Sequence, residues 1–187
     1  MNEVVTIENV DDFSARHAAF TETLCSHLEV EVDSSRHNYS YLDTDGLETK
    51  EKVFDAILDK AFDLHGINAM EDNQKKLSIG FIRIPDISTT AELSMHIAQA
   101  RQRPGVQHSV ICYHSQFPLC SRNKIESWLD DACNRKNPGR IWDVPEIRDA
   151  LSKTDELMIL VVATSVEEVG RDHDFDFMIH SVRSEER

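Results

Sequence analysis

Residues 157–163 read LMILVVA and form the most apolar run in the chain. Seven consecutive apolar residues, three of them β-branched, are typical of a strand that is buried on both faces of a sheet. Two shorter runs have the same character, SIGFIRI over residues 78–84 and HSVICY over residues 108–113. Stretches of helical periodicity separate these runs, so the sequence predicts an α/β fold, a parallel sheet with helices on both faces. We expect right-handed connections between its strands.

The remaining elements follow from the spacing of apolar residues and from capping residues. Helices are expected over residues 10–28, 48–64, 88–101 and 121–135, a short helix near Pro145, and a last strand over residues 175–179. We expect Gly66 to end the second helix as a left-handed cap. Ser88 or Thr89 is the expected N-cap of the third helix, and Ser121 that of the fourth.

Length and composition indicate one ordinary globular domain with room for an extra helical segment. The chain has 187 residues, of which 40% are hydrophobic and 29% charged. It contains no apolar run near the roughly 20 residues needed to cross a bilayer, and its start lacks the pattern of a signal peptide. We therefore expect a cytoplasmic protein without a membrane partner. The four cysteines have no CxxC spacing, so neither a zinc site nor a disulfide framework is predicted.

The net charge of −14 is unevenly distributed along the chain. Residues 1–72 contain 5 Lys/Arg and 17 Asp/Glu, whereas residues 101–140 contain 7 Lys/Arg and 3 Asp/Glu. Nucleic-acid phosphates bind to such local basic character. The basic middle permits a weak DNA-facing surface, although a solvated helix face would have the same composition. The acidic total argues against strong unspecific binding by this chain alone.

The loop after LMILVVA carries the most informative residues. It reads TSVEEVGRD over residues 164–172 and leaves the carboxyl end of a strand, where parallel sheets place their chemistry. The hydroxyl of Thr164 and the nearby backbone amides have the chemistry to hold a phosphate. Gly170 permits close backbone approach, and Asp172 has the charge to orient a cation. A plain strand-to-helix turn would also use Thr and Gly, so this loop alone leaves both interpretations open.

The segment VATSVEEVGRD, residues 162–172, resembles motif V of superfamily-two helicases. CYHSQFPL, residues 112–119, followed by Arg122, resembles the segment between motifs IV and V. With EEVGRDHDFD, residues 167–176, the chain is similar to the CRISPR-associated helicase-nuclease of type I-F systems. The similarity is strong over residues 78–179 and weaker over residues 10–77. In that family an RNA-guided Cascade complex recruits a large protein that unwinds and degrades target DNA, an antiviral defence.

This resemblance implies a partial, truncated RecA-like motor domain over residues 77–187, preceded by a helical connecting segment over residues 1–76. It also implies that Thr164, His114 and Arg122 contact single-stranded DNA. The interdomain ATP cleft would be lined by Glu168, Gly170, Arg171 and Asp172. The intact family uses ATP and magnesium as cofactors. Its implied partners are single-stranded DNA and the Cascade complex or the remaining helicase-nuclease parts.

Several family elements are missing from these 187 residues. The chain has no G-x-x-x-x-G-K-[ST] phosphate loop and no Asp-Glu box on an apolar strand. Where the family continues to a Gln-x-x-Gly-Arg motif with its arginine finger, residues 180–187 read HSVRSEER. We therefore expect no ATPase or nuclease activity and no bound cofactor or metal in this chain alone.

Three hypotheses of function remain. The first is a remnant or split piece of the type I-F helicase-nuclease, and the second is a stand-alone decoy that inhibits type I-F interference. The third is a sheet domain of another helicase-like family, against which the EVGRDHDFD run argues. His173-Asp174 has the residue types of a nuclease metal pair but lies in the motif V run without further ligands. Trp128 and Trp142 could stack a base, although tryptophans of amphipathic helices are usually core residues.

Overall fold

The computed structural model describes residues 42, 46–134, 136, 138–167 and 173–180. All of them belong to one compact unit that begins at Leu42. The helix expected over residues 10–28 lies outside the described residues.

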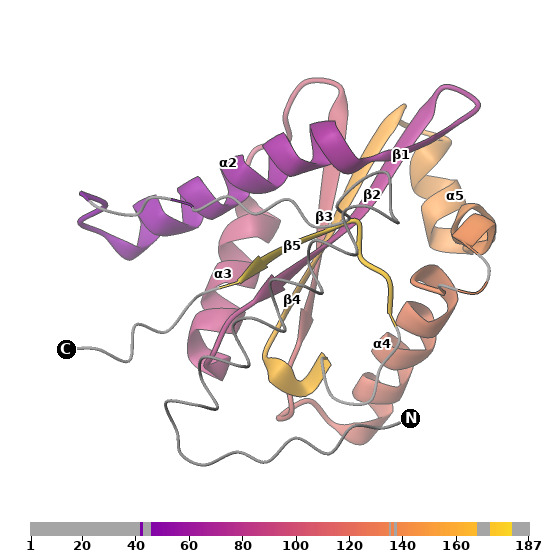
Figure 1. The fold of residues 1–187 in the computed structure, drawn as a ribbon. Helices are drawn as coiled ribbons and strands as arrows, with labels where there is room; N and C mark the ends of the chain where they lie inside the picture. The colour runs from indigo at the N-terminus through magenta and orange to yellow at the C-terminus, as the bar shows by residue number, and fades with distance from the viewer. Residues whose placement is uncertain (1–41, 43–45, 135, 137, 168–172, 181–187) are drawn as a thin grey trace, which may run out of the picture. The chain divides into compact units, whose positions relative to one another are not determined.

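The centre of this unit is a five-stranded sheet (Figure 1). Its strands are β1 (Met70–Asp72), β2 (Lys75–Arg83), β3 (Val106–Tyr113), β4 (Glu156–Ala163) and β5 (Phe177–His180). β4 lies between β2 and β3 and pairs in parallel with both, while β5 pairs in parallel with the other edge of β2. Every residue of β4 after Glu156 is buried. The LMILVVA run is therefore an interior parallel strand, as predicted.

Helices cover both faces of the sheet. They are α2 (Lys50–Asn68), α3 (Ile87–Gln99), α4 (Leu119–Ala132) and α5 (Pro145–Leu151), with short 3-10 helices at Pro138–Asp143 (η1) and Ser165–Glu167 (η2). Successive side chains of a strand point to opposite faces. Accordingly Leu157, Ile159 and Val161 of β4 pack with α4 and α5. Met158, Leu160 and Val162 pack with α2 and α3. The predicted fold class, an α/β fold with helices on both faces of the sheet, is confirmed.

One strand departs from the expected parallel arrangement. β1 pairs antiparallel with the start of β2, in the register Met70↔Leu77. The two strands are joined by Asn73 and Gln74, whose φ angles of 48° and 67° suit a two-residue hairpin. The sheet is therefore mixed, though mostly parallel. β1 has three residues and no buried side chain, so it has no apolar pattern by which the sequence could reveal it.

The helix caps expected at Gly66, at Ser88 or Thr89, and at Ser121 are all wrong. α2 continues through Gly66 to Asn68, because the buried His65 beside it bonds to Ser78 Oγ of β2 (2.7 Å) and holds the last turn against the sheet. α3 is capped by Asp86, which accepts the Thr89 backbone N–H at 2.8 Å, rather than by Ser88 or Thr89.

α4 begins earlier than expected. Pro118 occupies the N-cap position and forms no side-chain cap hydrogen bond, whereas Ser121 lies within the helix. The carbonyl of Pro118 accepts the backbone N–H groups of Ser121 and Arg122 instead. The first turn of α4 therefore follows directly after the short loop that connects β3 to α4.

α2 is attached to α3 and its following loop by two ion pairs and a hydrogen bond. The ion pairs join Lys50 to Glu92 and Asp59 to Arg103, and the hydrogen bond joins Asp55 to Nε2 of His96 (2.7 Å). α2 also contributes apolar residues to the core on this face: Phe54, Ile57, Leu58, Ala61 and Phe62. This helix lies within the expected connecting segment, residues 1–76. The boundary between residues 76 and 77 stays a prediction.

Gly80 is required by the packing of β5 on β2. Gly80 and Phe177 are cross-strand partners, and a Cβ atom built on Gly80 would lie 2.2 Å from Cζ of Phe177. Phe177 belongs to the core beneath α2 and α3. The phenyl ring thus occupies the space that any side chain at position 80 would need.

Gly80→Ala is expected to lower the free energy of unfolding by about 1–3 kcal/mol, because the methyl group must displace the ring of Phe177. Urea denaturation measures the change. Gly66→Ala is the matched control, since a Cβ there meets no atom within 4 Å. That exposed helical position should gain about 0.5–1 kcal/mol. Equal effects of the two substitutions would contradict this account of Gly80.

Candidate functional site

Backbone hydrogen bonds hold together the three loops at the carboxyl edge of the sheet. The N–H of Thr164, just after β4, donates to the carbonyl of Tyr113 at the end of β3 (3.3 Å). The N–H of Ile84, just after β2, donates to the carbonyl of Ala163 (2.9 Å). Because β2, β4 and β3 are parallel, their following loops meet at one edge, where such folds bind ligands.

His114 follows β3 directly and is therefore close to Thr164. Its ring lies against that of Phe117, with 4.4 Å between the ring centroids. Burial lowers the pKa of His114 from its ordinary value, so the imidazole is neutral near pH 7. Its Nδ1 is buried and has no hydrogen-bond partner among the residues that the structure describes. His114 is thus suited to hydrogen bonding rather than to carrying a positive charge.

Arg122 lies in the first turn of α4, at the same edge of the sheet. Its Nη2 is 3.7 Å from Oε1 of Glu126, which also accepts the hydroxyl hydrogen of Tyr113. The side chain is 30% exposed. The first turn of α4 contains no acidic residue and no side-chain cap. Uncapped N–H groups and a cation therefore lie beside the loop of His114, an arrangement that favours anions.

The loop after β4 is described at both of its ends. Thr164 is 9% exposed and is followed by η2. The expected cleft residues Glu168, Gly170, Arg171 and Asp172 lie outside the described residues. The chain is described again at His173, whose Nε2 is 2.9 Å from Oδ1 of Asp130 in α4. The N–H of Asp174 donates to the carbonyl of Cys133 (3.1 Å), so this end of the loop is held at the end of α4.

These contacts give His173 and Asp174 structural roles. His173 also packs edge-on against Phe175. Among the described residues no group of three or more His, Cys, Asp or Glu is arranged to hold a metal ion. The interpretation of His173-Asp174 as a nuclease metal pair therefore gains no support.

A second cluster has the residue types of a hydrolytic triad. Nδ1 of His65 is 2.7 Å from Oγ of Ser78, and Nε2 of His65 is 3.8 Å from Oε2 of Glu156. Ser78 is fully buried, however, and Glu156 begins β4, which places the cluster away from the carboxyl edge. Burial also lowers the pKa of His65. The cluster is a structural contact, one buried His65–Ser78 hydrogen bond with a carboxylate nearby, that the sequence did not indicate, because its members are far apart in the chain.

Asp176 was also missed by sequence reasoning. It lies beside Ile79 of β2, next to the start of β5. Its Oδ2 accepts the N–H of Ile79 (2.7 Å), and its own N–H donates to the Ile79 carbonyl (3.0 Å). Burial raises the pKa of Asp176 to about 6, and the charge of Asp174 contributes further. Asp176 thus provides hydrogen-bond partners for both the N–H and the carbonyl of Ile79, at the position just before β5 begins to pair with β2.

The structure brings Thr164, His114 and Arg122 to one end of the sheet. The mostly parallel sheet with helices on both faces is consistent with a RecA-like C-terminal helicase domain. The family model described as CRISPR-associated nuclease/helicase Cas3, C-terminal, matches residues 76–185. The chain belongs to this family.

Two relatives are both named CRISPR-associated nuclease/helicase Cas3 subtype I-F/YPEST. The protein of Pectobacterium atrosepticum is 32% identical over 178 residues, which are 91% of this chain and 16% of the relative. The protein of Pseudomonas aeruginosa is 32% identical over 121 residues, 63% of this chain and 11% of the relative. The chain thus spans less than a fifth of either relative. The expected type I-F resemblance is confirmed, and the decoy alternative gains no support.

No described helix has both the length and the apolar composition required of a membrane span.

The pKa of Asp176 predicts a pH-dependent stability. The folded-state pKa of about 6 exceeds the ordinary value of 3.8, so the native state binds this proton more tightly. The resulting stabilisation is complete below pH 3.8 and is lost as pH rises through about 6. Asp176→Asn should remove this loss while keeping an acceptor for Ile79. Relative to wild type, the variant should gain about 2–3 kcal/mol between about pH 4 and about pH 7.

Urea denaturation at a series of pH values measures this difference. Asp63→Asn is the control, because Asp63 is exposed on α2. The prediction is wrong if the stability profiles of wild type and Asp176→Asn stay parallel across this pH range.

Proposed function

We propose that this chain serves as the second motor domain of a type I-F CRISPR-associated DNA helicase-nuclease, and that its carboxyl edge holds the backbone of single-stranded DNA. The Thr164–Tyr113 backbone hydrogen bond is the observation that carries the proposal. It sets Thr164 beside His114, at the end of the sheet where α4 begins. The three residues expected to contact DNA thus share one edge.

The chemistry of this edge suits phosphate groups. The uncapped first turn of α4 presents backbone N–H groups, and helix N-termini of this kind bind anions. Arg122 adds a cation whose Nε has no hydrogen-bond partner within the described part of the chain. The neutral ring of His114 adds a hydrogen-bonding group without a further charge. Such contacts hold a strand by its backbone and do not read its sequence.

ATP and magnesium belong to the proposal only at the level of the larger protein. Glu168, Gly170, Arg171 and Asp172 would face an interdomain cleft shared with a first motor domain. The 187 residues contain no phosphate loop, and the described ones contain no cluster able to hold a metal ion. We therefore propose no role in ATP binding or hydrolysis for this chain alone. Its further proposed partners are the Cascade complex and the remaining helicase-nuclease parts.

Arg122→Ala should weaken binding of an oligo(dT) single strand about three- to tenfold at low salt, through loss of one phosphate contact. The slope of log affinity against log salt should fall by about 0.7. Fluorescence anisotropy of a labelled strand measures both quantities.

Arg148→Ala is the matched control for charge. Arg148 is an exposed arginine of α5, which precedes the amino end of β4 rather than its carboxyl edge. This variant should bind DNA as the wild type does. If both variants lose affinity equally, binding depends on net charge and the proposed edge is wrong.

The purified 187-residue chain should release phosphate from ATP no faster than buffer, with or without single-stranded DNA, because it has no phosphate loop. A coupled phosphate-release assay tests this. Asp172→Ala is the accompanying variant. Hydrolysis above background that this substitution abolishes would overturn the prediction.

A further inference from the structure

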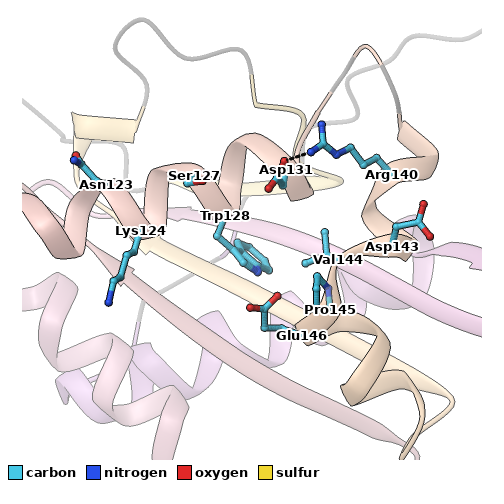
Figure 2. Close-up of a pocket in the computed structure, with 10 residues that line it drawn as sticks. All are labelled: Asn123, Lys124, Ser127, Trp128, Asp131, Arg140, Asp143, Val144, Pro145 and Glu146. Atoms are coloured by element: carbon cyan, nitrogen blue, oxygen red, sulfur yellow. Dashed lines mark ion pairs between the residues drawn. The ribbon is translucent and has the colours of Figure 1, made fainter.

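A groove lies on the sheet face that α4 and α5 cover, between α4 and the segment from η1 to the start of α5 (Figure 2). Its cavity volume is about 630 Å³. Trp128 of α4 lies in the middle of the groove, with Val144 and Pro145 on the opposite wall. Trp128 is six residues beyond Arg122, or about 9 Å along the helix axis. The centre of the groove is therefore distinct from the proposed DNA edge, although the lining residues Asn123 and Lys124 directly follow Arg122 in α4.

The position of Trp128 follows from the pattern of α4. Leu129 and Ala132 of this helix are buried, and Ile125 and Trp128 pack against the same core while staying partly exposed. Trp128 is thus on the margin of the apolar face. Its indole therefore both packs against the core and lines the groove, where the aromatic ring offers a contact to a ligand.

The charges around the groove favour a cationic ligand. Arg140 and Asp131 neutralise each other in an ion pair of 2.5 Å. Asp143 and Glu146 are exposed, and within the described residues neither carboxylate has an ion-pair or hydrogen-bond partner. Glu146 projects into the same space as the indole of Trp128 (Figure 2). The remaining cation, Lys124, lies toward the start of α4.

We propose that this groove binds an arginine- or lysine-bearing segment of a partner protein. A cation over the indole face of Trp128 would gain a cation–π interaction and would pair with Glu146 or Asp143. Apolar contact with Val144 and Pro145 would hold the stem of the long side chain. A stacked nucleic-acid base is disfavoured, because its phosphates would meet two unpaired carboxylates. The proposal does not depend on the DNA edge.

The test uses the 187-residue chain and the peptide Ac-Gly-Arg-Gly-Arg-Gly-NH2. The indole N–H resonance of Trp128, assigned with a Trp142→Phe variant, is followed by NMR during titration. We expect a saturable shift that the matching peptide with Gln in place of Arg does not produce. Asp143→Asn/Glu146→Gln should weaken binding at least about fivefold, since two ion pairs are lost.

Glu51→Gln/Asp63→Asn is the control, because it removes the same charge from two exposed positions of α2. This variant should bind the peptide within about twofold of wild type. Absence of a saturable shift, or equal weakening in both double variants, would overturn the proposal. It is also overturned if oligo(dT) shifts the Trp128 resonance and the arginine peptide does not, which would identify a base-stacking surface.

Discussion

The pairing of β4 with a parallel strand on each side is the constraint on which the rest of the structure depends. A strand in that position has its backbone hydrogen-bonded along both edges and both of its faces covered by helices. Side chains that both layers of helices cover must then be apolar, as they are in the LMILVVA run after Glu156. Alternate residues of this one strand join the two halves of the core, one with α4 and α5 and the other with α2 and α3.

The same pairing positions the carboxyl edge. β3 and β4 run in register from Val106↔Glu156 to Tyr113↔Ala163, so both strands end together. The residues after them, His114 and Thr164, are then neighbours whatever loops follow. The His173–Asp130 pair holds the far end of the β4 loop on α4. A single helix thus carries Arg122 at its start and receives the returning loop near its end.

The sequence predicted the elements whose burial imposes a long apolar pattern. It did not predict features that depend on a single contact between residues far apart in the chain. The strands at residues 78–84, 108–113 and 157–163 were predictable, because each is a short run dominated by apolar residues, and the run over 157–163, buried on both faces, contains no polar residue at all. The end of α2 was not, since it depends on a hydrogen bond between His65 and Ser78. Asp176 was equally hidden, because Ile79, whose backbone it satisfies, is 97 residues away in the chain.

The candidate site divides in the same way. The positions of Thr164, His114 and Arg122 follow from strand ends, which the apolar runs reveal, whereas the groove at Trp128 depends on how η1 folds back against α4. α4 consequently has two surfaces of opposite character. Its first turn combines free N–H groups with Arg122, whereas its middle faces Asp143 and Glu146. Because each surface repels the charge that the other attracts, a polyanion and a cationic segment would sort to different parts of one helix. A DNA strand and a basic partner could then be held at the same time.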